Sequence, residues 1–412
     1  MEYGLIGEHL GHSFSRDIHG RIGDYKYELK EIPREGLDAF MRARDFKGIN
    51  VTIPYKQDVI PYLDEISDSA RAIGAVNTIV NRGGRLYGYN TDYDGLKALV
   101  LRTGVDPAGG KVLILGTGGT SKTAEKVVRD LGAGTVLKVS RSARDGAITY
   151  ETALKEHRDA ILLINTTPCG MFPNCGEMPI DPTAFEGLEG VVDVIYNPLR
   201  TMLSLKAAEE GIPASCGLYM LVTQAVCASE YFFDTTYREE LKEEIFRAMY
   251  AEKENIVLIG MPGSGKTTVG RELSLKLDRK FIDTDNVIRE KTGKAPSEII
   301  RQQGEDEFRR IETEVIREVS AEGGRIIATG GGAVTRRENM IALKQNGRIW
   351  FIDRPLDQIV PTASRPLSSD REHLKALYDV RYPLYTAAAD EIISVRGTVE
   401  DEVRDIIRSR NS

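Results

Sequence analysis

The chain has 412 residues, which is long for one hydrophobic core, and one domain for each roughly 150 residues gives about three compact units. Its 55 Lys and Arg residues against 62 Asp and Glu residues give a formal net charge of -7, and no long basic run suggests nucleic acid or anionic lipid as a partner. Because the four cysteines lack CxxC spacing and the sequence has neither a signal peptide nor a long apolar run, we expect a cytoplasmic protein with free thiols and no membrane segment.

The first part of the chain alternates short strand-like runs with helical stretches. Residues 3–7, 25–32, 48–54 and 75–80 have the composition of strands, and residues 36–46 have helical spacing. This alternation predicts an α/β unit.

A second alternation starts at Lys111. Residues 111–116, 135–140, 160–167 and 190–196 are strand-like runs separated by helical stretches. Such a series predicts a parallel, doubly wound sheet of the Rossmann type.

A glycine-rich loop joins the first of these strands to a helix. Gly116 and Gly118 match the first two glycines of GxGxxG, where they make a tight turn and let the backbone approach a pyrophosphate. A purely structural glycine turn is the alternative. The next strand ends in Ser-Arg-Ser-Ala-Arg rather than in an acid, which favours NADP over NAD because arginine and hydroxyl groups suit a 2′-phosphate. A solvated arginine is the alternative here. The expected NADP-binding residues are Gly116, Gly118, Gly119, Ser140, Arg141, Ser142 and Arg144.

A charged stretch follows. Residues 235–255 carry acids and bases with spaced apolar residues and contain neither Pro nor Gly. We expect this connector to be helical and the domain boundary to lie within residues 250–255.

A second glycine-rich loop has a different chemistry. Residues 260–267 fit GxxxxGK[ST] completely, follow a strand-like run and precede a helical pattern. In such a loop backbone N–H groups cradle the phosphates of ATP, the lysine reaches the outer ones and the hydroxyl ligates Mg²⁺. The ATP-binding residues expected from this loop are Gly260, Gly263, Ser264, Gly265, Lys266, Thr267 and Thr268.

Two aspartates follow the next strand-like run. Asp283 and Asp285 are two residues apart, so in an extended segment they lie on the same side. One of these carboxylates can bind Mg²⁺ together with Thr267 while the other faces the hydroxyl group that accepts the phosphoryl group, and we expect Asp283 to be the metal ligand. A helix N-cap role for Asp285 is the alternative.

Polar clusters recur at the ends of the strand-like runs in the first part. Singly, these residues have ordinary explanations: Ser13 and Ser15 as turn or cap residues, Asn77 as a turn former, Lys56 as a surface amine and Asp92 as a helix N-cap. Together and in this order they resemble the shikimate dehydrogenase family over residues 1–233. The motifs are HSFS (12–15), GINVTIPYK (48–56), GAVNT (74–78), YNTDYDG (89–95), INTTPCGM (164–171), DVIYNPLRT (193–201) and GLYMLVTQA (217–225).

This resemblance implies a role for each matching residue. Lys56 and Asp92 correspond to the catalytic pair, and an ammonium group beside a carboxylate can supply the proton that a reduced ketone needs. The family often has Asn where Ser140 stands, and its second basic residue lies one position farther from Arg141 than Arg144 does, so strict NADP selectivity is left open. The residues that would bind the polyhydroxylated substrate are Ser13 and Ser15 for its carboxylate and Asn50, Thr52, Asn77 and Gln224 for its hydroxyl groups.

Motifs of the last part resemble shikimate kinase over residues 255–412. They are GEDEFRRIE (304–312), ATGGGAV (328–334), SRPL (364–367) and DVRYPLY (379–385). The resemblance implies that Asp285, Arg309 and Arg381 hold shikimate. It also implies that Gly331 and Gly332 permit close backbone approach and that Arg365 is the lid arginine that contacts the transferring phosphate of ATP.

Two features of this part leave alternatives open. Arg309 and Arg381 could instead form ion pairs on helix surfaces, with Glu305, Glu312 or Asp379 as partners, a role that suits Arg310 better. Residues 357–364 contain no arginine, although the family usually has one there near the adenine. We therefore expect weak ATP binding beside normal phosphate chemistry.

The two resemblances name consecutive reactions, since the product of the first is the substrate of the second. They imply NADPH-dependent reduction of 3-dehydroshikimate to shikimate and MgATP-dependent phosphorylation of shikimate, in aromatic amino acid biosynthesis. The alternatives are a quinate/shikimate dehydrogenase joined to another small-metabolite kinase, and a nucleotide-dependent regulatory binding protein. The sequence sets no oligomeric state. The expected α/β domains are a substrate-binding domain (1–104, completed by 215–250), a Rossmann-like NADP domain (105–214) and a P-loop kinase domain (255–412).

Overall fold

The computed structural model describes residues 1–11, 14–144, 146–360 and 371–411. The chain folds into two compact units: Met1–Asn197 with Thr201–Tyr250, and Pro198–Arg200 with Ala251–Ser412. The helix α9 (Glu240–Lys253) contains the division at Tyr250, so the connector is helical, as its composition predicts.

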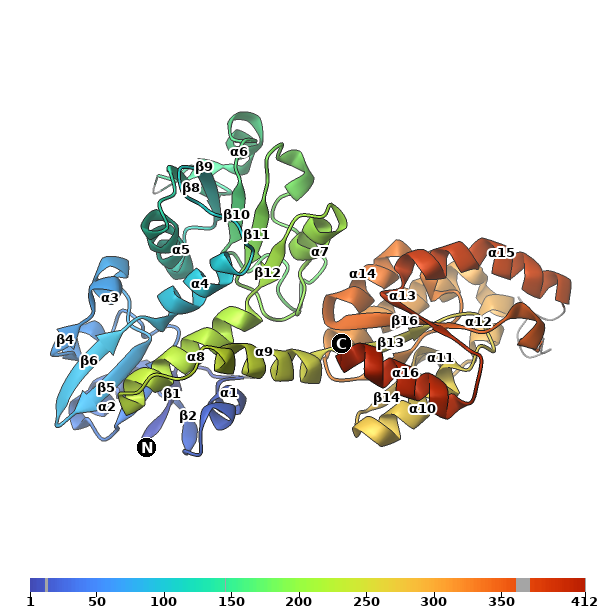
Figure 1. Ribbon diagram of the computed structural model, residues 1–412, viewed down its shortest axis with the longest axis horizontal. Helices are drawn as coiled ribbons and strands as arrows, with labels where there is room; N and C mark the ends of the chain where they lie inside the picture. The colour runs from blue at the N-terminus through green and yellow to red at the C-terminus, as the bar shows by residue number, and fades with distance from the viewer. Residues whose placement is uncertain (12–13, 145, 361–370, 412) are drawn as a thin grey trace. The chain divides into compact units, whose positions relative to one another are not determined.

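The first unit contains two six-stranded sheets (Figure 1). The first sheet has the strand order β2-β1-β3-β5-β6-β4, and β5 runs antiparallel to both of its neighbours. A core around Ile6, Met41 and Ile49 lies against this sheet. Its strands are β1 (Tyr3–Gly7), β2 (Tyr27–Glu31), β3 (Gly48–Val51), β4 (Glu65–Ile66), β5 (Thr78–Arg82) and β6 (Arg85–Tyr89). The helices of this part are α1 (Ser15–Ile22), α2 (Leu37–Ala43), α3 (Asp68–Ile73) and α4 (Thr91–Leu101).

The second sheet of this unit is parallel throughout, with the order β12-β11-β10-β7-β8-β9. Every residue of β10 and β11 is buried, because helices cover both faces of the sheet. The predicted doubly wound parallel sheet is confirmed. Its strands are β7 (Lys111–Leu115), β8 (Thr135–Ser140), β9 (Ile148–Thr149), β10 (Leu162–Asn165), β11 (Gly190–Asp193) and β12 (Ala214–Cys216). The helices are α5 (Gly119–Asp130), α6 (Tyr150–Glu156), α7 (Met202–Glu209) and α8 (Leu218–Phe233), of which α8 packs against α4 and also contacts α1.

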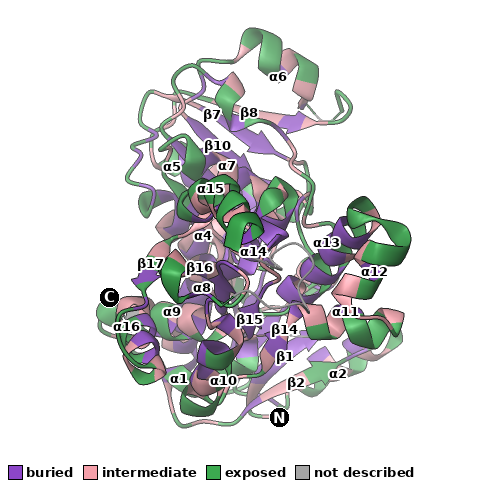
Figure 2. Cartoon of the chain, turned by 90° about the vertical axis from the view of Figure 1, so that its right-hand side faces the viewer, coloured by how far each residue is buried: buried purple, intermediate pink, exposed green. Residues whose placement is uncertain are grey.

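The second unit has one parallel sheet in the order β14-β15-β13-β16-β17. Its central strands are buried, whereas the outer faces of its helices are exposed (Figure 2). Trp350 of β16 is fully buried, and its indole N–H donates to Ser409 Oγ at 2.9 Å. The strands are β13 (Asn255–Ile259), β14 (Phe281–Asp283), β15 (Ile326–Ala328), β16 (Gly347–Asp353) and β17 (Glu391–Ser394). The helices are α10 (Lys266–Leu277), α11 (Thr284–Thr292), α12 (Pro296–Gln303), α13 (Glu305–Ala321), α14 (Arg337–Asn346), α15 (Arg371–Ala388) and α16 (Val399–Asn411).

Short connections complete both units. They include the 3₁₀ helices η1 (Arg34–Gly36), η2 (Ile60–Tyr62), η3 (Pro182–Ala184), η4 (Ala333–Thr335) and η5 (Leu356–Gln358). All four cysteines are free thiols, as expected. In the described ranges no helix has the length and apolar character needed to cross a membrane.

Candidate active sites

A cavity of about 540 Å³ opens in the first unit, lined by strands β1 and β3 of the first sheet, by helices α1, α4, α5 and α8, and by the segment that follows β11. The cavity brings together seven of the predicted substrate residues, although they come from distant parts of the sequence. They are Ser15, Asn50, Thr52, Lys56, Asn77, Asp92 and Gln224. Ser13, the eighth, lies outside the described residues.

Lys56 and Asp92 form an ion pair in this cavity. Lys56 Nζ donates a hydrogen bond to Asp92 Oδ2 at 2.5 Å, and the two side chains are 29% and 20% exposed. Asp92 lies in the first turn of α4, whose N-cap is Asn90: its side chain accepts from the backbone N–H of Tyr93. The cap role weighed for Asp92 therefore belongs to Asn90, and the Asp92 carboxylate faces Lys56.

The side chain of Asn77 is held in one orientation. Its Oδ1 accepts the backbone N–H of Thr91 at 2.8 Å and the hydroxyl of Thr78 at 3.0 Å. Because the oxygen is fixed in this way, the Asn77 amide group is left as a donor. Asn77 is 3% exposed and lines the cavity.

Asn50 has a different environment. Its Oδ1 accepts the Tyr27 hydroxyl at 2.7 Å, and its Nδ2 donates to Thr78 Oγ1 at 3.0 Å and to the Asn77 carbonyl at 3.3 Å. Both ends of the Asn50 amide are thus used within the protein. Asn50, which lines the cavity, thereby connects β2, β3 and β5.

The first glycine-rich loop lies between β7 and α5. Gly116 has a φ of 111°, and a Cβ there would lie 2.8 Å from Thr166 Oγ1, so the turn requires glycine. A Cβ at Gly118 or Gly119 would meet open space, and Gly118 provides no side-chain cap for α5. This end of α5 therefore has room for the pyrophosphate of a dinucleotide.

The strand β8 ends beside this loop with the predicted basic segment. Arg141 and Arg144 are exposed. The Ser140 hydroxyl donates to the Ser142 carbonyl, and the Ser142 N–H donates back to Ser140 Oγ at 3.2 Å, so these serines shape the turn. The exposed guanidinium groups fit a 2′-phosphate, and no acid occupies the end of the strand.

Asp193, at the end of β11, is fully buried. Its carboxylate accepts from Asn165 Nδ2, from the Ile195 N–H and from the Thr201 hydroxyl at 3.1, 3.1 and 2.7 Å. Burial raises the pKa of Asp193 to about 6. These residues belong to the INTTPCGM and DVIYNPLRT motifs, which therefore hold the strand ends together.

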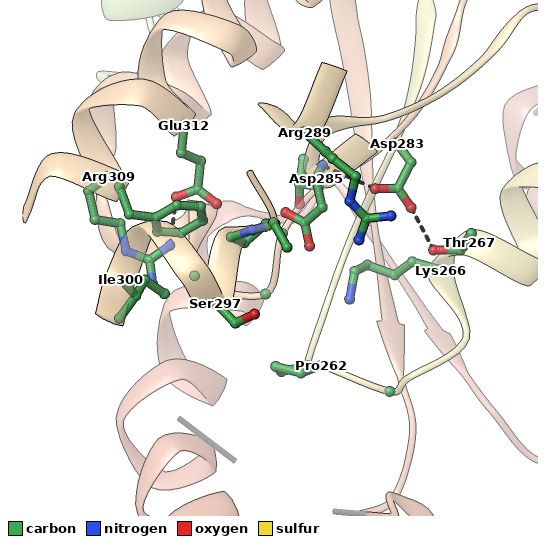
Figure 3. Close-up of a pocket in the computed structure, with 18 of the residues that line it drawn as sticks. Pro262, Lys266, Thr267, Asp283, Asp285, Arg289, Ser297, Ile300, Arg309 and Glu312 are labelled. Atoms are coloured by element: carbon green, nitrogen blue, oxygen red, sulfur yellow. Dashed lines mark hydrogen bonds and ion pairs between the residues drawn. The ribbon is translucent and has the colours of Figure 1, made fainter. Parts of the chain in front are cut away.

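A second cavity of about 540 Å³ lies in the second unit (Figure 3). The phosphate loop, the start of α11 and the Gly330–Gly332 turn line it. Arg309 and Glu312 lie at one end of the group of side chains in Figure 3, and Lys266, Thr267 and Asp283 lie at the other. The predicted residues that line the cavity are Gly263, Gly265, Lys266, Thr267, Thr268, Asp283, Asp285, Arg309, Gly331, Gly332 and Arg381. Gly260 and Ser264 belong to the loop itself, and Arg365 lies outside the described residues.

The phosphate loop has the expected strand-loop-helix context. Gly260, Gly263 and Gly265 all have positive φ, at 147°, 85° and 104°. Lys266 Nζ donates to the carbonyl groups of Gly260 and Met261 at 2.8 and 2.9 Å, and the Thr267 hydroxyl donates to Asp283 Oδ2 at 2.8 Å. A hydroxyl and a carboxylate in contact at the phosphate end are the donor set that suits Mg²⁺ beside phosphates.

Asp283 also caps the helix α11, because its Oδ1 accepts the backbone N–H of Asp285 at 3.1 Å. The N-cap alternative weighed for Asp285 is therefore wrong. Asp285 stands in the first turn of α11 and lines the cavity.

Arg309 is held by two carboxylates at the far end of the cavity. Arg309 Nη1 donates to Glu312 Oε2 at 2.6 Å and Nη2 to Glu305 Oε1 at 2.9 Å. The alternative pairing of Arg309 with Glu305 and Glu312 is therefore present, but the side chains of Arg309 and Glu312 are 7% and 0% exposed, so this second pair is buried at the cavity and not on a helix surface. Burial raises the pKa of Glu312, although Arg309 opposes the shift. Arg310, by contrast, pairs on the surface with Glu307 and Glu314, as expected.

The three glycines of the TGGG run each lie against another part of this site. A Cβ on Gly330 would lie 2.6 Å from Glu312 Oε1 and 2.9 Å from Asp285 Oδ1, and a Cβ on Gly331 would lie 2.7 Å from the Pro262 ring. A Cβ on Gly332 would collide with the Arg309 guanidinium. Because these three glycines have no side chains, the carboxylates of Glu312 and Asp285, the phosphate loop and Arg309 can all approach the same turn.

Several cavity residues were not singled out from the sequence. Phe14 and Tyr196 line the first cavity, with ring centroids 5.5 Å apart, and Glu312 and Arg289 line the second. Tyr196 lies shortly after the end of β11, within the DVIYNPLRT motif, and this position was a usable signal. The sequence signal at Glu312 was its position three residues after Arg309, which is typical of an ion pair on a helix surface.

Two family models match the chain. The model described as shikimate dehydrogenase substrate binding domain matches residues 5–79, and the shikimate kinase model matches residues 262–410. A shikimate dehydrogenase (NADP(+)) of Clostridium perfringens is 36% identical over 264 residues, which are 60% of this chain and 97% of that protein. The chain belongs to the shikimate dehydrogenase family. Its last part carries a shikimate kinase domain.

Solved structures agree with this assignment. A chorismate mutase/shikimate 5-dehydrogenase fusion protein from Clostridium acetobutylicum is 36% identical, with a TM-score of 0.57, over 60% of this chain and 96% of that one. Shikimate 5-dehydrogenase from Thermus thermophilus in complex with NADP(H) and shikimate is 28% identical, with a TM-score of 0.54, over 60% of this chain and 99% of that one. The family members therefore correspond to the first unit, and the kinase domain is additional to them.

Proposed function

We propose that this chain is a bifunctional enzyme that reduces 3-dehydroshikimate to shikimate with NADPH and then phosphorylates the 3-hydroxyl group of shikimate with MgATP. The observation that carries the proposal is the presence of both reaction centres in one chain. The Lys56–Asp92 pair lies in a polar cavity, and the phosphate loop opens into a cavity whose other end holds Arg309. The cytoplasmic location and the three-domain division expected from the sequence stay predictions.

In the first site Lys56 is the proton donor. NADPH supplies the hydride, and reduction of the ketone leaves an oxyanion that the Lys56 ammonium protonates, so that ketone, NADPH and a proton give alcohol and NADP⁺. Asp92 accepts a hydrogen bond from Lys56 and fixes the direction of that ammonium. Asn77, Thr52 and Gln224 bind the hydroxyl groups of the ring.

In the second site the reaction runs between the phosphate loop and Asp285. The substrate hydroxyl oxygen bonds to the γ-phosphorus of ATP, the bond to the bridging oxygen breaks and ADP leaves, while Asp285 takes the hydroxyl proton. Lys266 stabilises charge on the phosphates, and Thr267 and Asp283 would hold the Mg²⁺ that neutralises part of it. Arg309 and Arg381 bind the substrate carboxylate.

Substrate choice tests this proposal against its closest alternative. The full chain is assayed with shikimate and with quinate, for NADP⁺ reduction and separately for ADP release from MgATP. The proposal requires shikimate to be the preferred substrate in both assays. Preference for quinate in the first assay, or no ADP release with shikimate in the second, would contradict it. Lys56→Met and Lys266→Met should each remove one activity and spare the other, which assigns each activity to its site.

A further inference from the structure

Arg289 is a cation that lines the kinase cavity but has no place in the reaction described above. It lies on α11 one helical turn after Asp285. In Figure 3 its guanidinium points toward the same part of the cavity as the Lys266 ammonium and the Asp285 carboxylate. The side chain is exposed, and within the described residues no hydrogen bond or ion pair reaches its guanidinium.

The other cations of this cavity are already held. Lys266 donates to two carbonyl groups of the phosphate loop, and Arg309 donates to Glu305 and Glu312. Arg381 is 5% exposed, and its side chain forms a hydrogen bond with Tyr385. Among the cations that line this cavity in the described chain, Arg289 is therefore the one whose side chain makes no hydrogen bond or ion pair with the protein.

The position of Arg289 selects which anion it meets. Arg309 and Arg381 serve the carboxylate end of the cavity, and the phosphate loop serves the nucleotide end. Arg289 shares a helix turn with Asp285, which faces the accepting hydroxyl in the proposed reaction, and in Figure 3 its guanidinium lies on the nucleotide side of Asp285, toward Lys266 and Asp283. A phosphoryl group that moves from the loop to that hydroxyl must come to this part of the cavity.

We propose that Arg289 binds the transferred phosphoryl group and holds it as the phosphate ester of the product. This inference rests on the proposed kinase function. The new bond joins the acceptor oxygen to the γ-phosphorus, the bond to the bridging oxygen of ADP breaks, and the proton goes to Asp285, so the product carries a phosphate ester where the substrate carried a neutral hydroxyl group. A guanidinium group presents paired donors to such an ester. Arg289 thereby distinguishes product from substrate and stabilises the transferring group as charge develops on the acceptor side.

The test compares Arg289→Gln with wild type in the full chain. Binding of shikimate 3-phosphate and of shikimate is measured by calorimetry, together with kcat and the KM for shikimate. Loss of one charge-assisted contact should weaken product binding by about 10-fold to 100-fold and lower kcat by about 10-fold, while shikimate affinity stays within about twofold. Arg289→Lys should restore part of the product affinity because it keeps the charge.

The matched control is Arg301→Gln, an exposed arginine on α12 that does not line the cavity. It should leave every constant unchanged. Equal effects of Arg289→Gln on shikimate and on its phosphate, or no effect on either, would overturn the proposal and leave Arg289 as a solvated surface residue. If wild type fails to phosphorylate shikimate, the proposed function fails. The role of Arg289 is then decided by binding of inorganic phosphate in the presence of MgADP, which Arg289→Gln must weaken if the assignment is right.

Discussion

Removal of the Lys56 ammonium is the sharpest perturbation of the dehydrogenase site. Lys56 Nζ lies 2.5 Å from Asp92 Oδ2 in a partly buried pair, and in the proposed mechanism Asp92 orients this ammonium for proton transfer. Because a positioned general acid contributes about 10²-fold to 10⁴-fold, Lys56→Met should lower dehydrogenase kcat by about 10²-fold or more. Asp92→Asn keeps the shape of the side chain and removes its charge, so we expect a smaller loss of about 10-fold to 10²-fold.

The double variant separates two explanations. If Asp92 acts through Lys56, Lys56→Met with Asp92→Asn should be about as slow as Lys56→Met alone, because the carboxylate then has no ammonium to orient. The assay follows NADPH oxidation with 3-dehydroshikimate, and the affinity of the same preparation for NADPH, measured by calorimetry, shows that the first unit is folded. Losses that multiply in the double variant would refute the proposed division of roles. A normal kcat in folded Lys56→Met would refute the proton-donor assignment itself.

Three further predictions concern other parts of the chain. Glu312→Gln should raise the KM for shikimate in the kinase assay by about 10-fold, with the KM for ATP within about twofold, because Arg309 loses its buried counterion; an unchanged KM for shikimate would count against Arg309 as the carboxylate ligand. Arg141→Ala should raise the KM for NADPH by about 10-fold or more and leave that for NADH nearly unchanged, whereas equal changes would mean that Arg141 does not contact the 2′-phosphate. The pKa of Asp193 is about 6 in the folded chain, against an ordinary value of 3.8, so the folded state binds this proton more tightly than the unfolded state does. The free energy of unfolding of the first unit should therefore fall, by up to about 3 kcal/mol, as the pH rises from about 4 to about 6. Asp193→Asn should flatten that part of the pH profile in denaturant unfolding followed by dehydrogenase activity, and an unaltered profile would show that Asp193 is not its source.

The local patterns of the sequence were sufficient to predict the sheets and the two glycine-rich loops. Apolar runs such as residues 111–116 and 255–259 form buried parallel strands, and glycines after them take the positive φ values that the turns need. Caps were harder to predict. Asn90 and Asp283 cap α4 and α11, although the later acids Asp92 and Asp285 were equally plausible, because capping depends on where the backbone leaves its extended conformation.

Burial of charged pairs could not be predicted from spacing. An arginine three or four residues before a glutamate is typical of an exposed helix, and Arg310 forms such an exposed pair with Glu314. Arg309 instead packs against Gly332, a contact between segments far apart in the sequence, and this contact is what buries its pair with Glu312. The position of Arg289 in the cavity could not be predicted for the same reason, since only the folded chain brings it to the cavity that Lys266 and Asp285 line.

The central claim is that one chain performs both reactions, and a single time course tests it. Purified full chain receives 3-dehydroshikimate, NADPH and MgATP, and NADPH oxidation, ADP release and shikimate 3-phosphate are followed together. The account predicts that all three change in equal final amounts and that Lys56→Met abolishes phosphate-ester formation from 3-dehydroshikimate but not from added shikimate. Oxidation of NADPH without release of ADP, or neither reaction from a folded chain, would contradict it.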